Sequence, residues 1–291
     1  MSITADIGII GGRSFVGCIL LKKLISSGFS CWGFTRSSQG LTDMEMVKSH
    51  LKLYSDLKNL SDQSLFKTWF CLAPIWVLPD YFSLLEAHGV QKVIAVSSTS
   101  RISKLDSLDP KEQVIAEKLM EGEEALKSWC TEKGIDWVII RPTLIYGLGR
   151  DKNITAISAF IRRFGFFPIL GDADGLRQPI HAEDMADVCI AAMMEPKSSQ
   201  QIYHVSGGET ITYREMVIRV FKTLGKPVKI LKTPFWIFRV VVLVLGRLPR
   251  YQFLSIGMVE RMNEDLIFQN DKAMNELNFR SRPFILTEKD I

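Results

Sequence analysis

Short apolar runs alternate with longer segments of helical periodicity along the first half of the chain. Ala5–Ile10 is apolar almost throughout, which predicts a buried strand, and Phe15–Ser26 after it has the spacing of a helix. The alternation also predicts strands over Ser30–Thr35, Leu51–Tyr54, Thr68–Leu72, Lys92–Ser97 and Asp136–Arg141, and helices over Leu78–His88 and Pro110–Lys133. Strands without a polar face are typical of a parallel sheet covered by helices on both sides, so we expect a doubly wound α/β fold.

The segment GIIGGRSFVG (8–17) joins the first predicted strand to the first predicted helix. Gly11 stands where the chain must turn sharply, and Gly17 leaves room for the helix to pack closely on the strand. N–H groups at the start of such a helix bind a pyrophosphate, whose charge the helix dipole favours. Ser14 replaces the usual middle glycine, and its hydroxyl can cap the helix or donate to a phosphate oxygen. We predict a dinucleotide site that includes Gly11, Arg13, Ser14, Phe15 and Val16.

The end of the second predicted strand favours NADP over NAD. An NAD site places an acidic residue there for the ribose hydroxyls, whereas this chain has Arg36. A guanidinium next to a hydroxyl such as that of Ser37 suits a 2′-phosphate, and Arg13 can join it. The alternative interpretation is that Arg36 is simply a solvated residue at a strand end.

The apolar pattern loosens after Pro142. Helical spacing returns over 154–164, 182–194 and 213–224, with a strand-like run over 201–205. We therefore expect a Rossmann-type NAD(P)-binding domain over 1–145 that also receives segments near 178–206. Residues 146–291 are expected to form mainly a smaller substrate lobe over the carboxyl ends of the strands.

Composition limits the classes of partner. The chain has 291 residues, of which 47% are hydrophobic, so it can bury a large core. A net charge of +4 suits an anionic ligand but is too small to indicate a nucleic-acid partner. The five cysteines lie in apolar runs, and no metal-ligand spacing occurs, so we expect no metal site and a cytoplasmic location.

The segment PFWIFRVVVLVLGRL (234–248) allows two interpretations. Its apolar run is far shorter than the roughly 20 residues that a spanning helix needs. It fits a buried helix of the second lobe. It also fits a peripheral contact through 234–250 with a larger complex or with an inner membrane, the arginines then lying at head-group level.

Several stretches resemble, in order, the extended and atypical short-chain dehydrogenase/reductases, the nucleotide-sugar epimerase/dehydratase group. They are GGRSFVG (11–17), TRS (35–37), SDL (55–57), CLAP (71–74), VIAVSSTS (93–100), IIRPTLIYGLG (139–149), RQPIHAEDMA (177–186) and YHVSGGETITYREM (203–216). The cofactor residues that the resemblance implies are Asp56 and Leu57 at the adenine, Leu72, Ala73 and Pro74 along the cofactor, and Ser97 and Pro142 at the nicotinamide. It also implies that Arg177 and Thr99 contact a nucleotide-sugar substrate, and it is compatible with a homodimer.

The chain departs from this group at the residues that transfer protons. The group uses a Ser/Thr after the fifth strand, which Thr99 matches, and a Tyr-x-x-x-Lys on the next helix. There the tyrosine is the acid/base, and the lysine lowers its pKa. Aligned on EEAL (123–126), the chain has Ile115 and Leu119 at the two positions.

Substitutes for the missing pair are limited. Lys104 precedes the long helix, over the expected nicotinamide, and Tyr146 follows the sixth strand, although a packed structural tyrosine is the alternative for it. The literal Tyr-x-x-x-Lys at Tyr54–Lys58 falls on the adenine side, and we interpret it as chance. Two hypotheses follow: an NADP-dependent epimerase, dehydratase or reductase of nucleotide sugars, or a non-catalytic NADP-binding protein like the nucleotide-binding accessory subunit of respiratory complex I.

Overall fold

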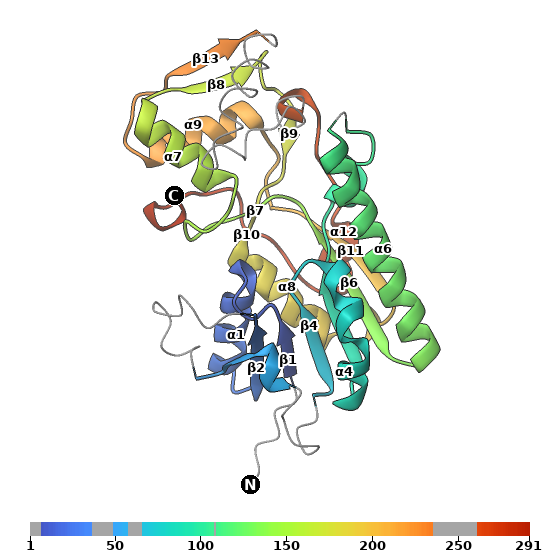
Figure 1. Ribbon diagram of the computed structural model, residues 1–291. Helices are drawn as coiled ribbons and strands as arrows, with labels where there is room; N and C mark the ends of the chain where they lie inside the picture. The colour runs from blue at the N-terminus through green and yellow to red at the C-terminus, as the bar shows by residue number, and fades with distance from the viewer. Residues whose placement is uncertain (1–6, 37–48, 58–65, 108, 235–260) are drawn as a thin grey trace.

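A seven-stranded parallel sheet forms the centre of the protein. The computed structural model describes residues 7–36, 49–57, 66–107, 109–234 and 261–291 (Figure 1). The sheet has the order β11-β6-β5-β4-β1-β2-β3. Its strands are β1 (Ile7–Ile10), β2 (Cys31–Thr35), β3 (Leu51–Leu53), β4 (Thr68–Cys71), β5 (Lys92–Val96), β6 (Asp136–Pro142) and β11 (Gln201–Val205). The strand order changes direction between β1 and β4, so the predicted doubly wound Rossmann fold is confirmed.

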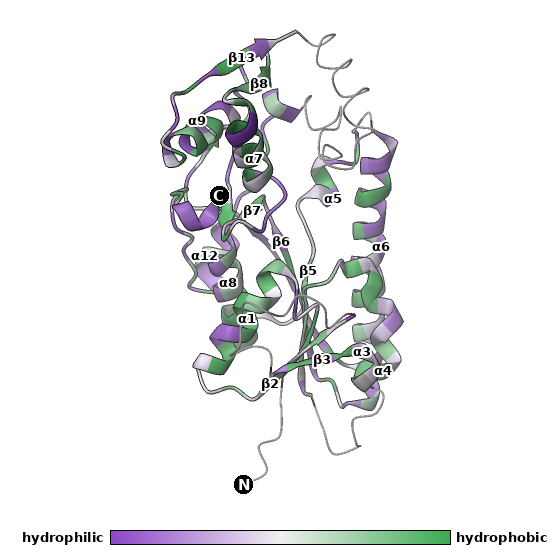
Figure 2. Cartoon of the chain, turned by 60° about the vertical axis from the view of Figure 1, so that its left-hand side comes forward, coloured by the Kyte–Doolittle hydropathy of each residue, from purple (hydrophilic) through white to green (hydrophobic). Residues whose placement is uncertain are grey.

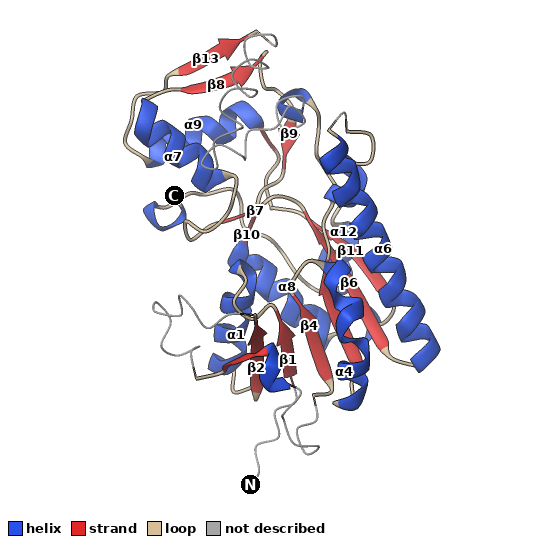
Figure 3. Ribbon diagram, in the orientation of Figure 1, coloured by secondary structure: helices blue, strands red, loops and turns tan. Residues whose placement is uncertain are grey.

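Helices cover both faces of this sheet (Figure 3). They are α1 (Phe15–Ser26) and α8 (Ala182–Met194) on one face, and η1 (Ile75–Tyr81), α4 (Phe82–Ala87) and α6 (Pro110–Lys133) on the other. Ile9 belongs to the core under α1 and α8, whereas its neighbour Ile10 belongs to the core under α6. Successive residues of a strand point to opposite faces, so two apolar cores require apolar runs, and the inner strands carry much of the hydrophobic colour in Figure 2.

Helix α6 has the ends that its sequence predicts. Asp109 caps it by accepting a hydrogen bond from the Lys111 N–H at 3.0 Å, and Pro110 occupies the first turn. Gly134 ends the helix with a φ of 66°, a left-handed conformation that glycine adopts without strain. In place of the single helix expected over Leu78–His88, the chain forms the 3-10 helix η1 followed by the short helix α4. Pro79 lacks the N–H that a regular α-helix needs at that position.

A smaller lobe lies over the carboxyl ends of the strands. It contains α7 (Ile154–Phe164), β8 (Phe167–Leu170), β9 (Leu176–Arg177), β12 (Ile211–Thr212), α9 (Tyr213–Thr223), β13 (Ile230–Thr233) and η4 (Arg261–Asn263) around a third apolar core. The short parallel pair β7 (Ile145–Tyr146) and β10 (Ile180–His181) connects the two parts. Apart from Pro234, the segment 234–250 lies outside the described residues. Among the described helices, none is long and apolar enough to cross a membrane.

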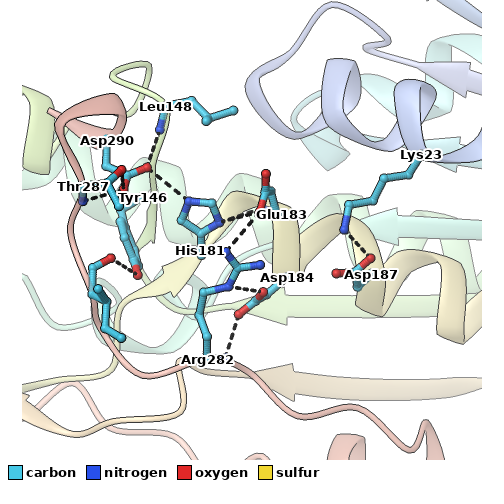
Figure 4. A network of polar contacts seen from close by, with 11 residues as sticks. Lys23, Tyr146, Leu148, His181, Glu183, Asp184, Asp187, Arg282, Thr287 and Asp290 are labelled. Carbon is cyan, nitrogen blue, oxygen red and sulfur yellow. Dashed lines mark hydrogen bonds and ion pairs between the residues drawn. The ribbon is translucent and has the colours of Figure 1, made fainter. Parts of the chain in front are cut away.

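The carboxyl-terminal residues bind the junction between the two parts (Figure 4). The His181 Nδ1 accepts the Glu183 N–H at 3.2 Å, which leaves the proton on Nε2, and Nε2 lies 3.2 Å from the Asp290 Oδ1. The Leu148 N–H also donates to this carboxylate. Burial raises the pKa of Asp290, but these hydrogen bonds and those from Thr287 outweigh it and hold the pKa well below its usual range.

Replacing Asp290 with asparagine is expected to lower the free energy of unfolding by about 1.5–3 kcal/mol at pH 7, because hydrogen bonds to a charged group are lost. The folded-state pKa is depressed, so the stabilisation is present above about pH 4 and is lost as the pH falls below it. Urea unfolding between pH 3 and pH 7 measures both effects. Glu288→Gln, an exposed change in the same short helix η5 (Glu288–Asp290), should leave the curve unchanged.

Candidate functional site

The loop between β1 and α1 is closed by its own hydrogen bonds. The Ser14 N–H donates to the Gly11 carbonyl at 2.8 Å, and the Ser14 hydroxyl accepts the Gly17 N–H at 3.1 Å. Ser14 is therefore the N-cap of α1, one of the two roles that the sequence allowed it. Gly11 has a φ of 80°, where most side chains would be strained.

The loop has no room for side chains at its glycines, as a close phosphate cradle requires. A Cβ on Gly11 would lie 2.7 Å from the Ala73 nitrogen, and one on Gly17 would lie 2.2 Å from the Gly11 carbonyl oxygen. The residues present therefore fit a bound dinucleotide. Gly17→Ala is expected to open the loop and to weaken NADPH binding at least tenfold, measured by NADPH fluorescence. Gly28→Ala, whose Cβ would meet nothing within 4 Å, carries the backbone strain of a φ of 81° away from the cavity and so controls for a loss of stability alone; equal binding by both variants would contradict the cradle.

A cavity of about 640 Å³ lies beside this loop. The structure brings six predicted cofactor residues to it besides Gly11: Arg13, Ser14, Arg36, Leu72, Ala73 and Pro74. Val16 is buried in α1. Asp56 and Leu57 lie on the short helix α3 (Tyr54–Leu57), which follows β3, and Ser37 lies outside the described residues.

Sequence reasoning missed Tyr54 and Tyr81 in this cavity. The Gly11 N–H donates to the Tyr54 hydroxyl at 2.9 Å, and the two tyrosine rings lie 5.0 Å apart. Burial raises the pKa of Tyr54, so its phenol stays protonated and neutral. The available signal was the position of Tyr54 directly after the third strand, on the cofactor side of the sheet.

A second cavity, of about 490 Å³, opens at the carboxyl ends of β5 and β6. It gathers the predicted residues Phe15, Ser97, Thr99, Lys104, Pro142 and Arg177. The Thr99 hydroxyl donates to the Pro142 carbonyl at 3.0 Å, which joins the ends of the two strands. The nicotinamide side and the substrate side of the predicted site thus share one cavity.

Helix α6 presents a buried acid and apolar residues to this region. Leu119 is buried in the sheet core and Ile115 packs against it, so the two positions of the expected proton-transfer pair are apolar in the fold as well. One turn further, Glu123 is fully buried and accepts the Ser97 hydroxyl at 2.6 Å and the Arg141 Nε at 2.9 Å. Arg101 lies 3.1 Å from the same carboxylate.

A second acid of α6 connects the sheet domain to the smaller lobe. Glu112 lies 3.2 Å from the Lys104 Nζ and accepts the Arg261 Nη2 at 2.6 Å. Burial raises the pKa of Glu112, but Arg261, Lys104 and Ser107 outweigh it and lower the pKa to about 2. The carboxylate is therefore ionised at neutral pH, and Lys104 is held by it at the edge of the cavity.

The second cavity is strongly cationic. Its lining contains Lys104, Arg150, Lys152, Arg177 and Arg261, and among the described residues that line it the only acid is Asp151. Asp151 caps α7 by accepting the Ile154 N–H at 2.6 Å. Arg177 is 5% exposed, and its guanidinium donates to the carbonyls of Leu176 and Glu264; burial lowers its pKa to about 10. Such an arrangement favours a bound anion.

Tyr146, a predicted catalytic residue, is placed differently. It is fully buried in the core of the smaller lobe, its ring 5.2 Å from that of His181 and 4.8 Å from that of Phe284. Its hydroxyl donates to the Ile285 carbonyl at 3.4 Å (Figure 4). It is absent from the described residues lining the second cavity, so the structure does not bring it to Thr99 and Lys104.

A doubly wound sheet with a tight glycine loop after its first strand is the architecture of the Rossmann class, whose members typically bind dinucleotides at that loop. Residues 81–206 match the NAD dependent epimerase/dehydratase family. This match covers less than half of the chain, and it agrees with the resemblance to extended and atypical short-chain dehydrogenase/reductases.

The chain is similar to several known proteins of this kind. It is 25% identical over 127 residues to a UDP-glucose 4-epimerase of Vibrio cholerae, covering 44% of this chain and 39% of that protein. It is 28% identical over 163 residues to short-chain dehydrogenase/reductase family 42E member 1 of Mus musculus, covering 51% and 41%. It is 22% identical over 142 residues to NADH dehydrogenase [ubiquinone] 1 alpha subcomplex subunit 9 of Arabidopsis thaliana, covering 46% and 35%. The chain thus spans about two fifths of the length of these curated relatives.

A solved structure agrees with the fold over nearly the whole chain. The UDP-glucuronic acid 4-epimerase of Bacillus cereus, in complex with UDP-glucuronic acid and NAD, has a TM-score of 0.69 and 16% identity. The match covers 96% of this chain and 94% of that one. At this identity the likeness concerns the fold alone.

Proposed function

We propose that the protein binds NADP(H) and an anionic nucleotide-sugar substrate on the two sides of its glycine loop and catalyses their oxidoreduction. The observation that carries this proposal is the second cavity, where five cations line the wall beside the predicted nicotinamide residues Ser97 and Pro142 and Glu112 pairs with only two of them. A bound nicotinamide would accept a hydride from the substrate or return one to it.

The cofactor part of the proposal rests on the first cavity. Arg36 is exposed at the end of β2 and lines the cavity together with Arg13 and the N-terminus of α1. A 2′-phosphate is bound best by a guanidinium, because the hydrogen bonds are charge-assisted. This favours NADP(H) over the NAD that is present in the solved epimerase.

The substrate part rests on charge. Glu112 accepts both terminal nitrogens of Arg261 and lies 3.2 Å from the Lys104 Nζ, so Arg177 and Lys152 are the cations of the cavity that we assign to a diphosphate. Arg177 is buried and donates only to backbone carbonyls among the hydrogen bonds described for it, and a bound phosphate would reduce the cost of burying its charge. The solved epimerase of similar fold binds a substrate of this chemical class.

Lys104 is the group we assign to proton transfer. Helix α6 supplies no hydroxyl or amine at Ile115 and Leu119, whereas Lys104 and Thr99 line the same cavity. The ammonium of Lys104 can donate a proton to a substrate oxygen, and Thr99 can donate a hydrogen bond to the same oxygen once it leaves the Pro142 carbonyl.

Turnover is tested by incubating the protein with NADP⁺ or NADPH and a panel of UDP-, GDP- and dTDP-sugars, following absorbance at the nicotinamide band and sugar isomers by chromatography. Lys104→Met is expected to lower kcat at least 100-fold with NADPH binding unchanged, as for loss of a general acid. Lys118→Met, an exposed change on α6, is the control. Turnover that survives Lys104→Met would remove this assignment while keeping the enzyme.

A second function is favoured by one observation: both positions of the proton-transfer pair are apolar and packed into the core. The protein would then bind NADP(H) without turnover, as a structural or sensing subunit. The similarity to a subunit of NADH dehydrogenase supports this alternative. Absence of turnover across the whole panel, with NADPH retained through purification, would favour it over the enzyme.

A further inference from the structure

The far end of the smaller lobe combines exposed apolar side chains with cations. Phe164, Val228 and Leu231 are 41%, 46% and 51% exposed. Arg163 and Lys229 are exposed beside them, and Lys226 is partly exposed. We call these six residues the lobe-tip surface. In Figure 1 it lies around β13, β8 and the end of α7, at the end of the molecule away from the seven-stranded sheet.

The segments that carry these residues lie side by side although they come from two parts of the chain. The Lys226 Nζ donates to the Arg162 carbonyl at 3.1 Å, at the carboxyl end of α7. The Phe167 N–H donates to the Lys229 carbonyl at 2.9 Å, and β13 then pairs with β8 in parallel. The residues that follow α7 and α9 are thus held side by side, with Leu231 opposite Pro168 in the register.

The ends of the helices explain only part of this composition. Cations in the last turn stabilise the helix dipole, which accounts for Arg163 on α7 and for Lys226 at the same helix end. The helix dipole does not account for Phe164, Val228 and Leu231. At these exposed positions a polar side chain would cost the fold no buried apolar contact. An exposed apolar group among cations is the composition of surfaces that bind lipid head groups and insert into the interface below them.

We propose that the lobe-tip surface binds a membrane that contains anionic lipids. Arg163, Lys226 and Lys229 would lie at the phosphates, and the three apolar side chains would enter the head-group region. A second copy of the chain is disfavoured as the occupant, because two such surfaces would repel each other. Nucleic acid is disfavoured because Val228 and Leu231 offer nothing to a phosphate backbone or a base.

The sequence that follows β13 also favours an anionic membrane as the partner of the lobe-tip surface. β13 leads into PFWIFRVVVLVLGRLPR (234–250), a sequence that combines the same two kinds of side chain. The cofactor cavities lie elsewhere, at the strand ends of the sheet, so docking by this surface is independent of the proposed function.

The test is co-sedimentation of the full chain with vesicles of phosphatidylcholine alone or with 30% phosphatidylglycerol. We expect binding only to the anionic vesicles. Each cation contributes about fivefold, equivalent to about 1 kcal/mol, so Arg163→Gln with Lys229→Gln should weaken binding about 25-fold. The matched control, Lys111→Gln with Lys118→Gln on the exposed face of α6, removes the same charge and should retain binding.

A third variant separates lipid insertion from charge alone. Phe164→Ser with Leu231→Ser should weaken binding to anionic vesicles at least tenfold without lowering its dependence on salt. Unchanged NADPH binding and far-ultraviolet circular dichroism verify that each variant folds. No binding by the wild-type chain, full binding by the Arg163/Lys229 variant, or displacement by RNA with no effect of Phe164→Ser would each overturn the proposal.

Discussion

Replacing Arg36 with alanine is expected to weaken NADPH binding about 10- to 100-fold, because a charge-assisted hydrogen bond to a phosphate contributes roughly 1.5–3 kcal/mol. NADH binding should change less than threefold, since NADH lacks the 2′-phosphate. Isothermal titration with both cofactors measures the difference. Lys22→Ala, an exposed cation of α1 outside the described lining of the cavity, serves as the matched control.

The comparison of the two cofactors is the informative part of this measurement. Arg36 is exposed and lies next to Tyr54 and Tyr81 in the cavity, so its loss leaves the fold intact. Equal weakening of NADPH and NADH would mean that Arg36 serves the shared part of the cofactor, and the assignment of the 2′-phosphate would be withdrawn.

The largest effect on stability is expected from Glu123→Gln. Glu123 is fully buried, and its carboxylate is bound by Arg141 and by the Ser97 hydroxyl. Removing one charge of a buried pair leaves the other without compensation, which costs about 3–5 kcal/mol. Urea unfolding followed by circular dichroism gives the change in the free energy of unfolding.

The next residue supplies the control for this change. Glu124 is exposed and, among the described residues, its ion pair is with Lys127 on the same helix, so Glu124→Gln should cost under about 1 kcal/mol. A loss below that size for Glu123→Gln would mean that Arg141 is compensated from elsewhere. Because the Glu123 carboxylate accepts the Ser97 hydroxyl, Glu123→Gln is also expected to weaken cofactor binding at the nicotinamide side.

The features that the sequence predicts correctly are those of local structure. Gly11, Ser14 and Gly17 act through the strand, turn and helix in which they lie, so their spacing was sufficient. Pro110 and Gly134 likewise mark the two ends of α6. The parallel sheet followed from apolar runs, because both of its faces are covered.

Contacts between distant residues were beyond the reach of such patterns. The Tyr54 hydroxyl meets Gly11 across 43 positions, and Arg261 meets Glu112 across 149. The two residues of each pair lie on different elements, so no local sequence spacing predicts either contact. Tyr146 shows the converse: it follows β6 as a catalytic residue could, but β7 turns its ring into the lobe core, where Phe284 from the far end of the chain covers it.

Strand β11 gives the sheet an order of assembly that differs from the order of synthesis. β11 pairs with β6, but it is synthesised after much of the smaller lobe. One edge of β6 therefore remains unpaired between the synthesis of Pro142 and that of Gln201. An open edge is a template for pairing with other chains. A fragment cut near residue 145 would keep that edge and would lack α8, which covers one face. An isolated cofactor-binding domain would therefore have to include α8 and β11 to remain soluble.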